Sequence, residues 1–128
     1  MDYIKKAELS ENMLPGRKVR TAIGKDGPVV SKKMTYGYTT YSADCGPMEP
    51  HHHAEEIVYI CDVKNGYVRY GKEKDVLGEK IYVKTGETLH FPELEWHVFG
   101  YDGDDGYIDI LFFYAQVDNI RPEENNSK

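Results

Sequence analysis

Three of the five histidines in this 128-residue chain are adjacent, at His51, His52 and His53. Two carboxylates follow directly, at Glu55 and Glu56. On an extended chain alternate side chains share a face, so His51 and His53 can point the same way while His52 points the opposite way. Two imidazoles beside a carboxylate form the beginning of a divalent-metal site, because imidazole suits zinc, iron, nickel and copper, and an added carboxylate admits manganese.

A second informative stretch ends at another histidine. Five residues separate Gly86 from Pro92, and four more separate Pro92 from His97. Together with the histidine cluster, this spacing resembles the cupin superfamily, whose motifs are usually written G-x5-H-x-H-x3,4-E-x6-G and G-x5-P-x-G-x2-H-x3-N. The resemblance implies an all-β fold, a jelly-roll barrel also described as a double-stranded β-helix. Leu94 stands where the family has Gly, and Tyr101 where it has Asn.

The resemblance implies four metal ligands: His51, His53, Glu56 and His97. The first motif is irregular here, with two residues between His53 and Glu56 where the family has three or four. Two alternatives therefore stay open, with His52 replacing His51 or Glu55 replacing Glu56. Glu56 is preferred because the apolar strand begins directly after it, as in the family.

The implied cofactor is one divalent metal ion, and manganese, iron, nickel and zinc all suit these ligands. Three neutral histidines and one carboxylate leave two of six positions for a small-molecule ligand, bound through carboxylate, carbonyl or vicinal hydroxyl oxygens. Small cupins include isomerases, lyases and dioxygenases, so the resemblance implies a metalloenzyme acting on a sugar, a sugar acid or a hydroxy or keto acid. The alternative is a non-catalytic module that binds or senses such a molecule through the metal.

Four side chains on predicted strands near the motifs are candidates for lining a substrate pocket. They are Tyr59, Trp96, His90 and Arg69. Tyr59 and Trp96 would form apolar walls, and the guanidinium of Arg69 suits an acidic substrate group. His90 lies between two apolar residues and is expected to support the site rather than to bind the metal.

The remaining sequence is typical of β-structure, with 11 Tyr, 4 Phe and 1 Trp, and with 12 Gly that separate short apolar segments. The predicted strands are Arg17–Ile23, Lys33–Ser42, Glu56–Cys61, Gly66–Tyr70, Glu79–Lys84, Thr88–Phe91, Trp96–Tyr101 and Tyr107–Val117. Asn65-Gly66 predicts a type I′ hairpin, because both residues tolerate positive φ. This many strands must form a barrel or a sandwich, because open β edges invite aggregation.

We expect one domain, a barrel with N-terminal extension strands over residues 1–120, followed by a polar tail over 121–128. A short helix is predicted at Tyr3–Leu9. The two cysteines, Cys45 and Cys61, are too few for a disulfide framework.

The net charge of -6 and the short basic clusters predict no nucleic-acid partner, because a phosphate backbone would be repelled. The sequence has neither an apolar run of about 18 residues nor an apolar stretch at its start, so we expect a cytoplasmic protein without a membrane partner. The resemblance also implies a homodimer, with Arg17–Ile23 and Lys33–Ser42 as candidate strands that pair with the neighbour's sheet.

Overall fold

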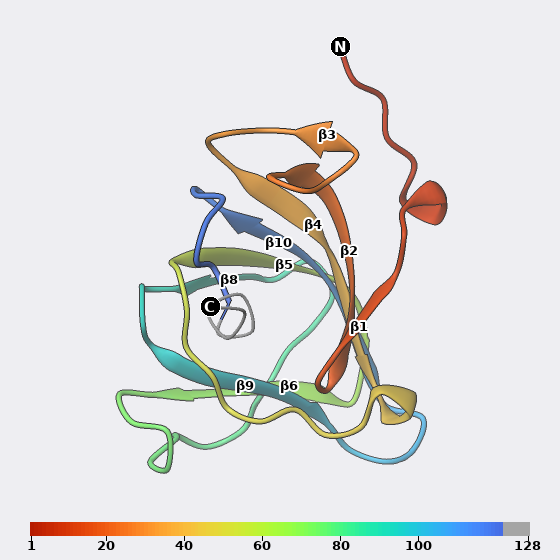
Figure 1. Ribbon diagram of the computed structural model, residues 1–128. Helices are drawn as coiled ribbons and strands as arrows, with labels where there is room; N and C mark the ends of the chain where they lie inside the picture. Colours follow the sequence, from red (N-terminus) through yellow and green to blue (C-terminus); the bar gives the residue numbers. More distant parts are fainter. Residues whose placement is uncertain (122–128) are drawn as a thin grey trace.

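The computed structural model describes residues 1–121, which fold into two sheets that face each other across a barrel (Figure 1) and are antiparallel except for the parallel pairing of β3 with β2. The large sheet has the order β1-β2-β4-β10-β5-β8, with β3 paired to β2, and the small sheet has the order β7-β6-β9. The large sheet comprises β1 (Asn12–Leu14), β2 (Arg17–Gly24), β3 (Val29–Val30), β4 (Thr35–Ser42), β5 (Glu56–Lys64), β8 (Thr88–Phe91) and β10 (Tyr107–Tyr114). The small sheet comprises β6 (Gly66–Gly71), β7 (Ile81–Tyr82) and β9 (Trp96–Tyr101).

The core lies between the two sheets. Val58 and Ile60 of β5 belong to the same buried cluster as Val68 of β6, Phe99 of β9 and Phe112 of β10. None of these side chains is more than 3% exposed. Burial alternates along β4, β5 and β10, so each of these strands presents one set of side chains to the interior and the other set to the outer face.

Each predicted strand has a counterpart, and two predicted ranges, Thr88–Phe91 and Trp96–Tyr101, match β8 and β9 residue for residue. The predicted strand Glu79–Lys84 is reduced to the two residues of β7. In place of the predicted helix at Tyr3–Leu9 there is a single 3-10 turn, η1 (Lys6–Glu8), and a second, η2 (Ala43–Cys45), follows β4.

Two further expectations concern the strands that would pair with a neighbour and the C-terminal tail. The strands proposed for pairing with a neighbour, Arg17–Ile23 and Lys33–Ser42, correspond to β2 and β4, and both lie inside the large sheet between other strands. The tail predicted for 121–128 lies outside the described residues except for Arg121. Within residues 1–121, none of the helical segments has the length and apolar character needed to span a membrane.

The prediction of a β-hairpin at Asn65-Gly66 is wrong. The preceding strand, β5, belongs to the large sheet and the following strand, β6, to the small one, so the dipeptide forms a corner between sheets. Of the two residues only Asn65 has a positive φ, at 54°. Gly66 is needed for close packing instead, because a Cβ added there would lie 2.4 Å from Ile108 Cγ1 and 2.7 Å from Val63 Cγ2.

Gly66→Ala is therefore expected to lower the free energy of unfolding by about 1–3 kcal/mol, the usual cost of overpacking a core. Denaturant unfolding followed by circular dichroism measures this change. Gly78→Ala is the matched control, since the nearest atom to its added Cβ is the Tyr70 carbonyl oxygen at 3.4 Å. Equal destabilisation by the two substitutions would contradict the corner packing.

Candidate metal centre

A pair of backbone hydrogen bonds brings the late histidine to the early cluster. The His51 N–H donates to the His97 carbonyl oxygen at 3.0 Å, and the His97 N–H donates to the His51 carbonyl oxygen at 2.9 Å. Further along the same pairing, the Leu94 N–H donates to the His53 carbonyl oxygen at 2.9 Å. The segment that carries the histidine cluster thus runs alongside β9, and the register of this pairing fixes which histidines meet.

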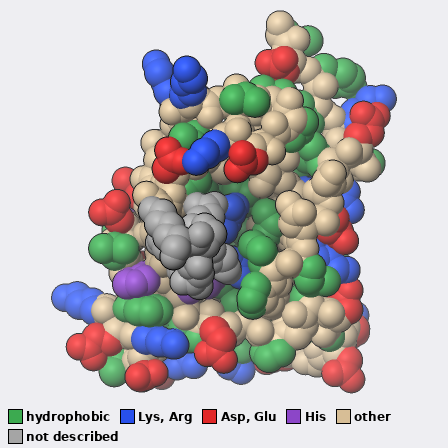
Figure 2. Space-filling model, viewed as in Figure 1, with side chains coloured by type: hydrophobic (Ala, Val, Ile, Leu, Met, Phe, Trp, Pro, Cys, Tyr) green, Lys and Arg blue, Asp and Glu red, His purple; other side chains and the backbone are tan. Residues whose placement is uncertain are grey.

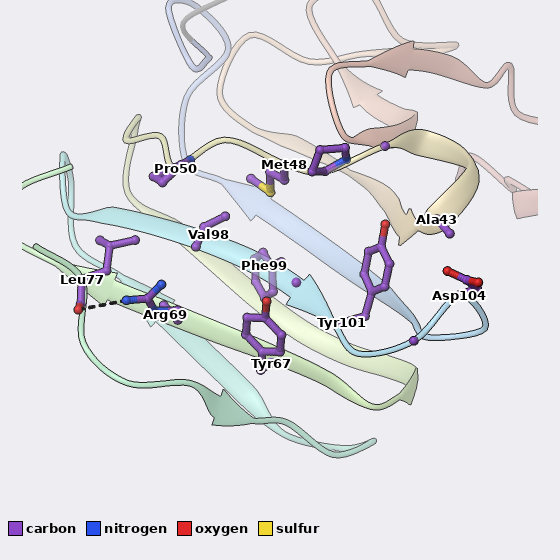
Figure 3. A pocket seen from close by; sticks show the side chains of 14 residues that line it. Ala43, Met48, Pro50, Tyr67, Arg69, Leu77, Val98, Phe99, Tyr101 and Asp104 are labelled. Carbon is purple, nitrogen blue, oxygen red and sulfur yellow. Dashed lines mark hydrogen bonds between the residues drawn. The ribbon is translucent and has the colours of Figure 1, made fainter. Parts of the chain in front are cut away.

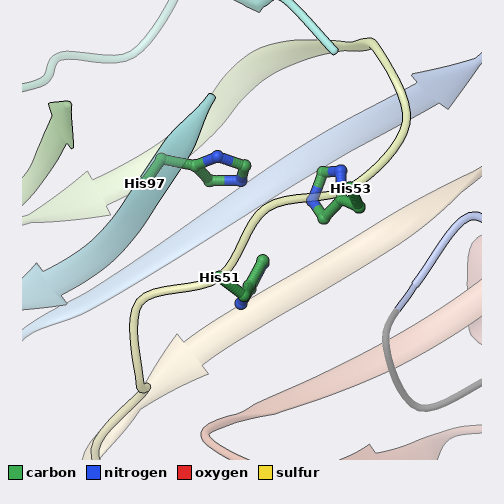
Figure 4. Close-up of side chains that lie close together, drawn as sticks. All are labelled: His51, His53 and His97. Carbon is green, nitrogen blue, oxygen red and sulfur yellow. The ribbon is translucent and has the colours of Figure 1, made fainter. Parts of the chain in front are cut away.

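Three imidazoles converge inside the barrel (Figure 4). One possible ligand atom from each of His51, His53 and His97 lies within 4.8 Å of the others. The ring centroids are 5.0 Å apart for His51 and His53, 5.0 Å for His51 and His97, and 4.8 Å for His53 and His97. His53 is 7% exposed and His97 is 1% exposed, so the cluster lies in the interior.

Backbone carbonyls fix the tautomers of two of these rings. Nδ1 of His53 donates to the Ala54 carbonyl oxygen at 2.9 Å, and Nδ1 of His97 donates to the Glu95 carbonyl oxygen at 2.9 Å. A carbonyl oxygen only accepts hydrogen bonds, so each Nδ1 carries the proton. Each Nε2 therefore presents a lone pair, which is how a metal-binding histidine is oriented.

The carboxylate of Glu56, the first residue of β5, lies beside both lone pairs. Its Oε1 is 3.6 Å from His53 Nε2 and 3.8 Å from His97 Nε2. Two ligands that share one ion at about 2.1 Å lie roughly 3.0–4.2 Å apart, so these spacings fit a common ion. The Tyr114 hydroxyl on β10 hydrogen-bonds to the Glu56 carboxylate.

Burial sets the protonation of these groups. It lowers the pKa of His51 to about 2 and that of His97 to about 3, and the neighbouring imidazoles lower both pKa values further. Burial also raises the pKa of Glu56 to about 7, against the opposing effects of the Tyr114 hydrogen bond and of Arg121 and Arg17. His51 and His97 are therefore neutral at physiological pH, the form that binds metal.

No family model matches this sequence, and no curated protein matches it. Several solved structures are similar to it. The polyketide cyclase RemF from Streptomyces resistomycificus matches with a TM-score of 0.69 at 19% identity, over 95% of this chain and 82% of that one. The oxalate decarboxylase of Lactobacillus farciminis, in a formate complex, matches with a TM-score of 0.66 at 18% identity, over 90% of this chain and 32% of that one. An iron(II) form of HppE with an alternative substrate matches with a TM-score of 0.64 at 9% identity, over 89% of this chain and 60% of that one.

All three neighbours are cupin-fold proteins. The chain has the cupin fold. At these identities the likeness concerns the fold, which agrees with the two facing antiparallel sheets and with the barrel that the motifs predicted. The three-histidine group in this cupin barrel supports a divalent metal.

The cupin barrel places the alternative ligands outside the cluster. His52 points away from His51 and His53 and stacks on Trp96, with ring centroids 3.9 Å apart and planes at 14°. Its Nδ1 lies 3.2 Å from the Leu94 carbonyl oxygen. Glu55 is exposed, and its Oε2 lies 2.6 Å from His90 Nε2. The geometry therefore favours His51 over His52 and Glu56 over Glu55.

Three candidate pocket residues do not face the histidines. Tyr59 is 42% exposed and lies between the buried residues Val58 and Ile60, so alternation turns it to the outer face of β5. Trp96 points away from the interior because the next residue on β9, His97, points inward. His90 is exposed and is bonded to Glu55.

Arg69 lies on the outer face of the small sheet, in an open cavity of about 480 Å³ (Figure 3). Its cross-strand neighbour is Val98, whose side chain points away from the barrel interior. Its Nε donates to the Gly78 carbonyl oxygen at 2.7 Å and its Nη2 to the Leu77 carbonyl oxygen at 3.3 Å. β9 therefore separates Arg69 from the histidines, and the structure does not bring this residue to the metal centre.

Two arginines that the sequence motifs do not include act on the site. Arg17, at the start of β2, is 5% exposed, and its charge acts on His51, His97 and Glu56. The Arg121 guanidinium carbon lies 5.0 Å above the Phe112 ring. The alternation of inward and outward side chains along β2 could have predicted that Arg17 faces the core. Its proximity to the motif residues, however, depends on closure of the barrel.

The outer surface of the molecule carries both acidic and basic side chains. Among the described residues on the face seen in Figure 2, acidic and basic side chains alternate around the periphery and do not form a broad basic patch.

Proposed function

We propose that this chain is a metal-dependent enzyme that binds one divalent ion through His51, His53 and His97, with Glu56 as the fourth ligand. The observation that carries the proposal is the convergence of three imidazoles within 4.8 Å of one another inside a cupin barrel. Neutral imidazoles with one carboxylate suit manganese, iron, nickel and zinc. One of the similar structures is an iron(II) form of its protein, which is consistent with this set of metals.

The neighbours of the ligands support a fixed geometry. Phe91 stacks on the His97 ring, with centroids 4.1 Å apart and planes at 18°, and keeps water from one side of it. Carbonyl oxygens hold the protons of His53 and His97 at Nδ1. Groups that orient ligands in this way typically contribute about 10- to 100-fold to metal affinity. The bound ion would supply Lewis-acid activation of a ligand oxygen.

We propose that the substrate is a small acid, such as a sugar acid or a hydroxy or keto acid. Arg17 and Arg121 both act electrostatically on Glu56, so two guanidinium groups lie near one carboxylate. Their positive charge, added to that of a divalent ion, would attract an anionic ligand more strongly than a neutral one. One of the similar structures is an oxalate decarboxylase in complex with formate, and both oxalate and formate are small carboxylate anions.

Metal analysis followed by a substrate screen tests this function. The protein is purified without a nickel column, its metal content is measured, and hydroxy, keto and sugar acids are compared with their neutral analogues in the presence of manganese, iron, nickel or zinc. We expect about one metal equivalent per chain and turnover of an acid.

Two results would revise the function. Binding of an acid without turnover would assign the non-catalytic binding module instead. Failure to retain any of the four metals after reconstitution would contradict the metal centre itself.

A further inference from the structure

The cavity that contains Arg69 lies along β9, outside the barrel. It has a volume of about 480 Å³ and is lined by β9 from Val98 to Tyr101. These four residues span about 10 Å at roughly 3.3 Å per residue. Met48 and its neighbours in the segment before the histidine cluster form the opposite wall (Figure 3). Ligand pockets typically have volumes of about 300–1,000 Å³, so the cavity has room for a small molecule.

The pairing of β9 leaves this cavity open. β9 is the end strand of the small sheet, and the bridge between His51 and His97 on its other side is isolated. Pro47 lies in the facing segment and has no N–H with which to extend that bridge. The segment packs on Gly16, because a Cβ added to Gly16 would lie 2.6 Å from Met48 Cα. The wall of the cavity is therefore fixed by packing before any ligand binds.

The Tyr67 ring supplies an aromatic surface to the cavity. It lies against Gly100 of β9, since a Cβ added to Gly100 would lie 2.5 Å from two atoms of the Tyr67 side chain. The Lys80 Nζ is 4.5 Å from the centroid of this ring, and the Tyr82 ring meets it edge-on with centroids 5.7 Å apart. These contacts hold the ring in place, so it offers a fixed surface to the apolar part of a ligand.

Arg69 supplies a positive charge at one end of the cavity. Its hydrogen bonds to the Gly78 and Leu77 carbonyl oxygens use two of its five N–H groups and fix the plane of the guanidinium. Within residues 1–121, no carboxylate forms an ion pair with Arg69. A partly buried guanidinium that is oriented by carbonyl groups and has no acidic partner is suited to binding an anion.

The two ends of the cavity differ in charge. Figure 3 shows Arg69 and Leu77 at one end and Asp104 at the other, with the apolar side chain of Val98 between them. A carboxylate is therefore attracted to the Arg69 end, and a second anionic group at the far end would be repelled by Asp104. This arrangement selects a ligand with one negative charge and an apolar body.

We propose that this cavity binds a small apolar monocarboxylate, such as an arylalkanoic acid. Its carboxylate accepts hydrogen bonds from Arg69, and its apolar body lies against Tyr67 and Val98. The site is separate from the metal centre, because Val98 points outward from β9 and the next residue before it, His97, points inward. The inference therefore does not depend on the proposed function.

Amide NMR of the full isotope-labelled chain, titrated with phenylpropionate, tests the proposal. We expect a dissociation constant of about 1 mM or tighter, with shifted amides around Arg69, at Met48 and along β9 from Val98 to Tyr101. The neutral amide of phenylpropionate is expected to bind at least about 10-fold more weakly, because it has no charge to pair with the guanidinium. An analogue with a second carboxylate at the para position of the ring is also expected to bind more weakly.

A matched pair of variants tests the role of the Arg69 charge. Val98 is the cross-strand neighbour of Arg69, so Val98→Glu places a carboxylate beside the guanidinium without removing its bonds to the loop. We expect Val98→Glu to bind phenylpropionate about 10-fold or more weakly than Val98→Gln, which has the same shape without the charge. Arg69→Met is expected to abolish binding. Arg20→Met, which removes an arginine that is paired with Glu11 on the large sheet, is expected to preserve it.

Several results would overturn the proposal. They are equal affinities of the Val98→Glu and Val98→Gln variants, binding of the neutral amide as tight as that of the acid, and no binding by the wild type at about 10 mM acid. Amide shifts confined to the histidine cluster would also overturn it, because they would place the acid at the metal centre. Saturation with zinc is expected to leave the affinity unchanged, so a failure of this site and a failure of the metal centre are distinguishable.

Discussion

His97→Ala is expected to lower the affinity for a divalent metal by on the order of 100-fold or more, so that the purified variant contains almost none. The substitution removes one of three converging imidazoles. Loss of a group that merely orients a metal ligand typically costs about 10- to 100-fold, and loss of the ligand itself is expected to cost at least as much. The backbone hydrogen bonds between residues 51 and 97 do not involve the side chain, so the loop keeps its attachment to β9.

Elemental analysis of metal in protein purified without a nickel column checks this result, and circular dichroism checks the fold. His97 is 1% exposed, so alanine also leaves a cavity, and His97→Asn provides a variant with a smaller volume change. His90→Ala is the matched control, because His90 lies outside the barrel beside Glu55. A full metal equivalent in both His97 variants would remove this residue from the site.

The grouping of His51 with His53, and the exclusion of His52 from that group, could be predicted because both depend on local alternation. A two-residue period is enough to place His51 and His53 on one face and His52 on the other, and the structure shows this arrangement. The spacing from Gly86 to His97 also predicted that a distant histidine would return to the cluster. The backbone pairing between residues 51 and 97 is the physical means of that return.

Orientation relative to the barrel was harder to predict. The strand containing Tyr59 was located correctly, but this strand is apolar on both faces, so no polar side marks its exterior. The direction of the Arg69 side chain was hard to predict for a related reason. A one-residue shift in register moves a side chain to the opposite face of the sheet. Asn65-Gly66 carries a strong local hairpin signal, which the separation of β5 and β6 into different sheets overrides.

Closure of the barrel brings side chains that no sequence motif contains close to Glu56. Arg17 and Tyr114 are both distant from Glu56 in the sequence, yet both act on its carboxylate. Nothing in their local sequence distinguishes them from other inward-facing residues of β2 and β10. Their role near the centre follows from the three-dimensional arrangement of the sheets.

We expect the ratio of two apparent metal affinities, that of the wild-type protein over that of Glu56→Gln, to fall about 10-fold from pH 8 to pH 6. Burial raises the pKa of Glu56 from its ordinary value of 4.5 to about 7 in the metal-free protein. As a ligand, Glu56 must be ionised, so below pH 7 a proton has to leave before the metal binds. The ionised fraction of Glu56 therefore falls from about nine-tenths at pH 8 to about one-tenth at pH 6, roughly a factor of 10, whereas the neutral amide of the glutamine variant has no proton to lose.

The ratio separates the titration of Glu56 from that of His51 and His97. The pKa values of His51 and His97 lie near 2 and 3, so neither ring gains a proton between pH 8 and pH 6. Competition titrations against a chelator of known pH dependence, at several pH values, measure both affinities. A ratio that stays constant across this range would show that Glu56 does not bind the metal as a carboxylate that is protonated in the metal-free barrel.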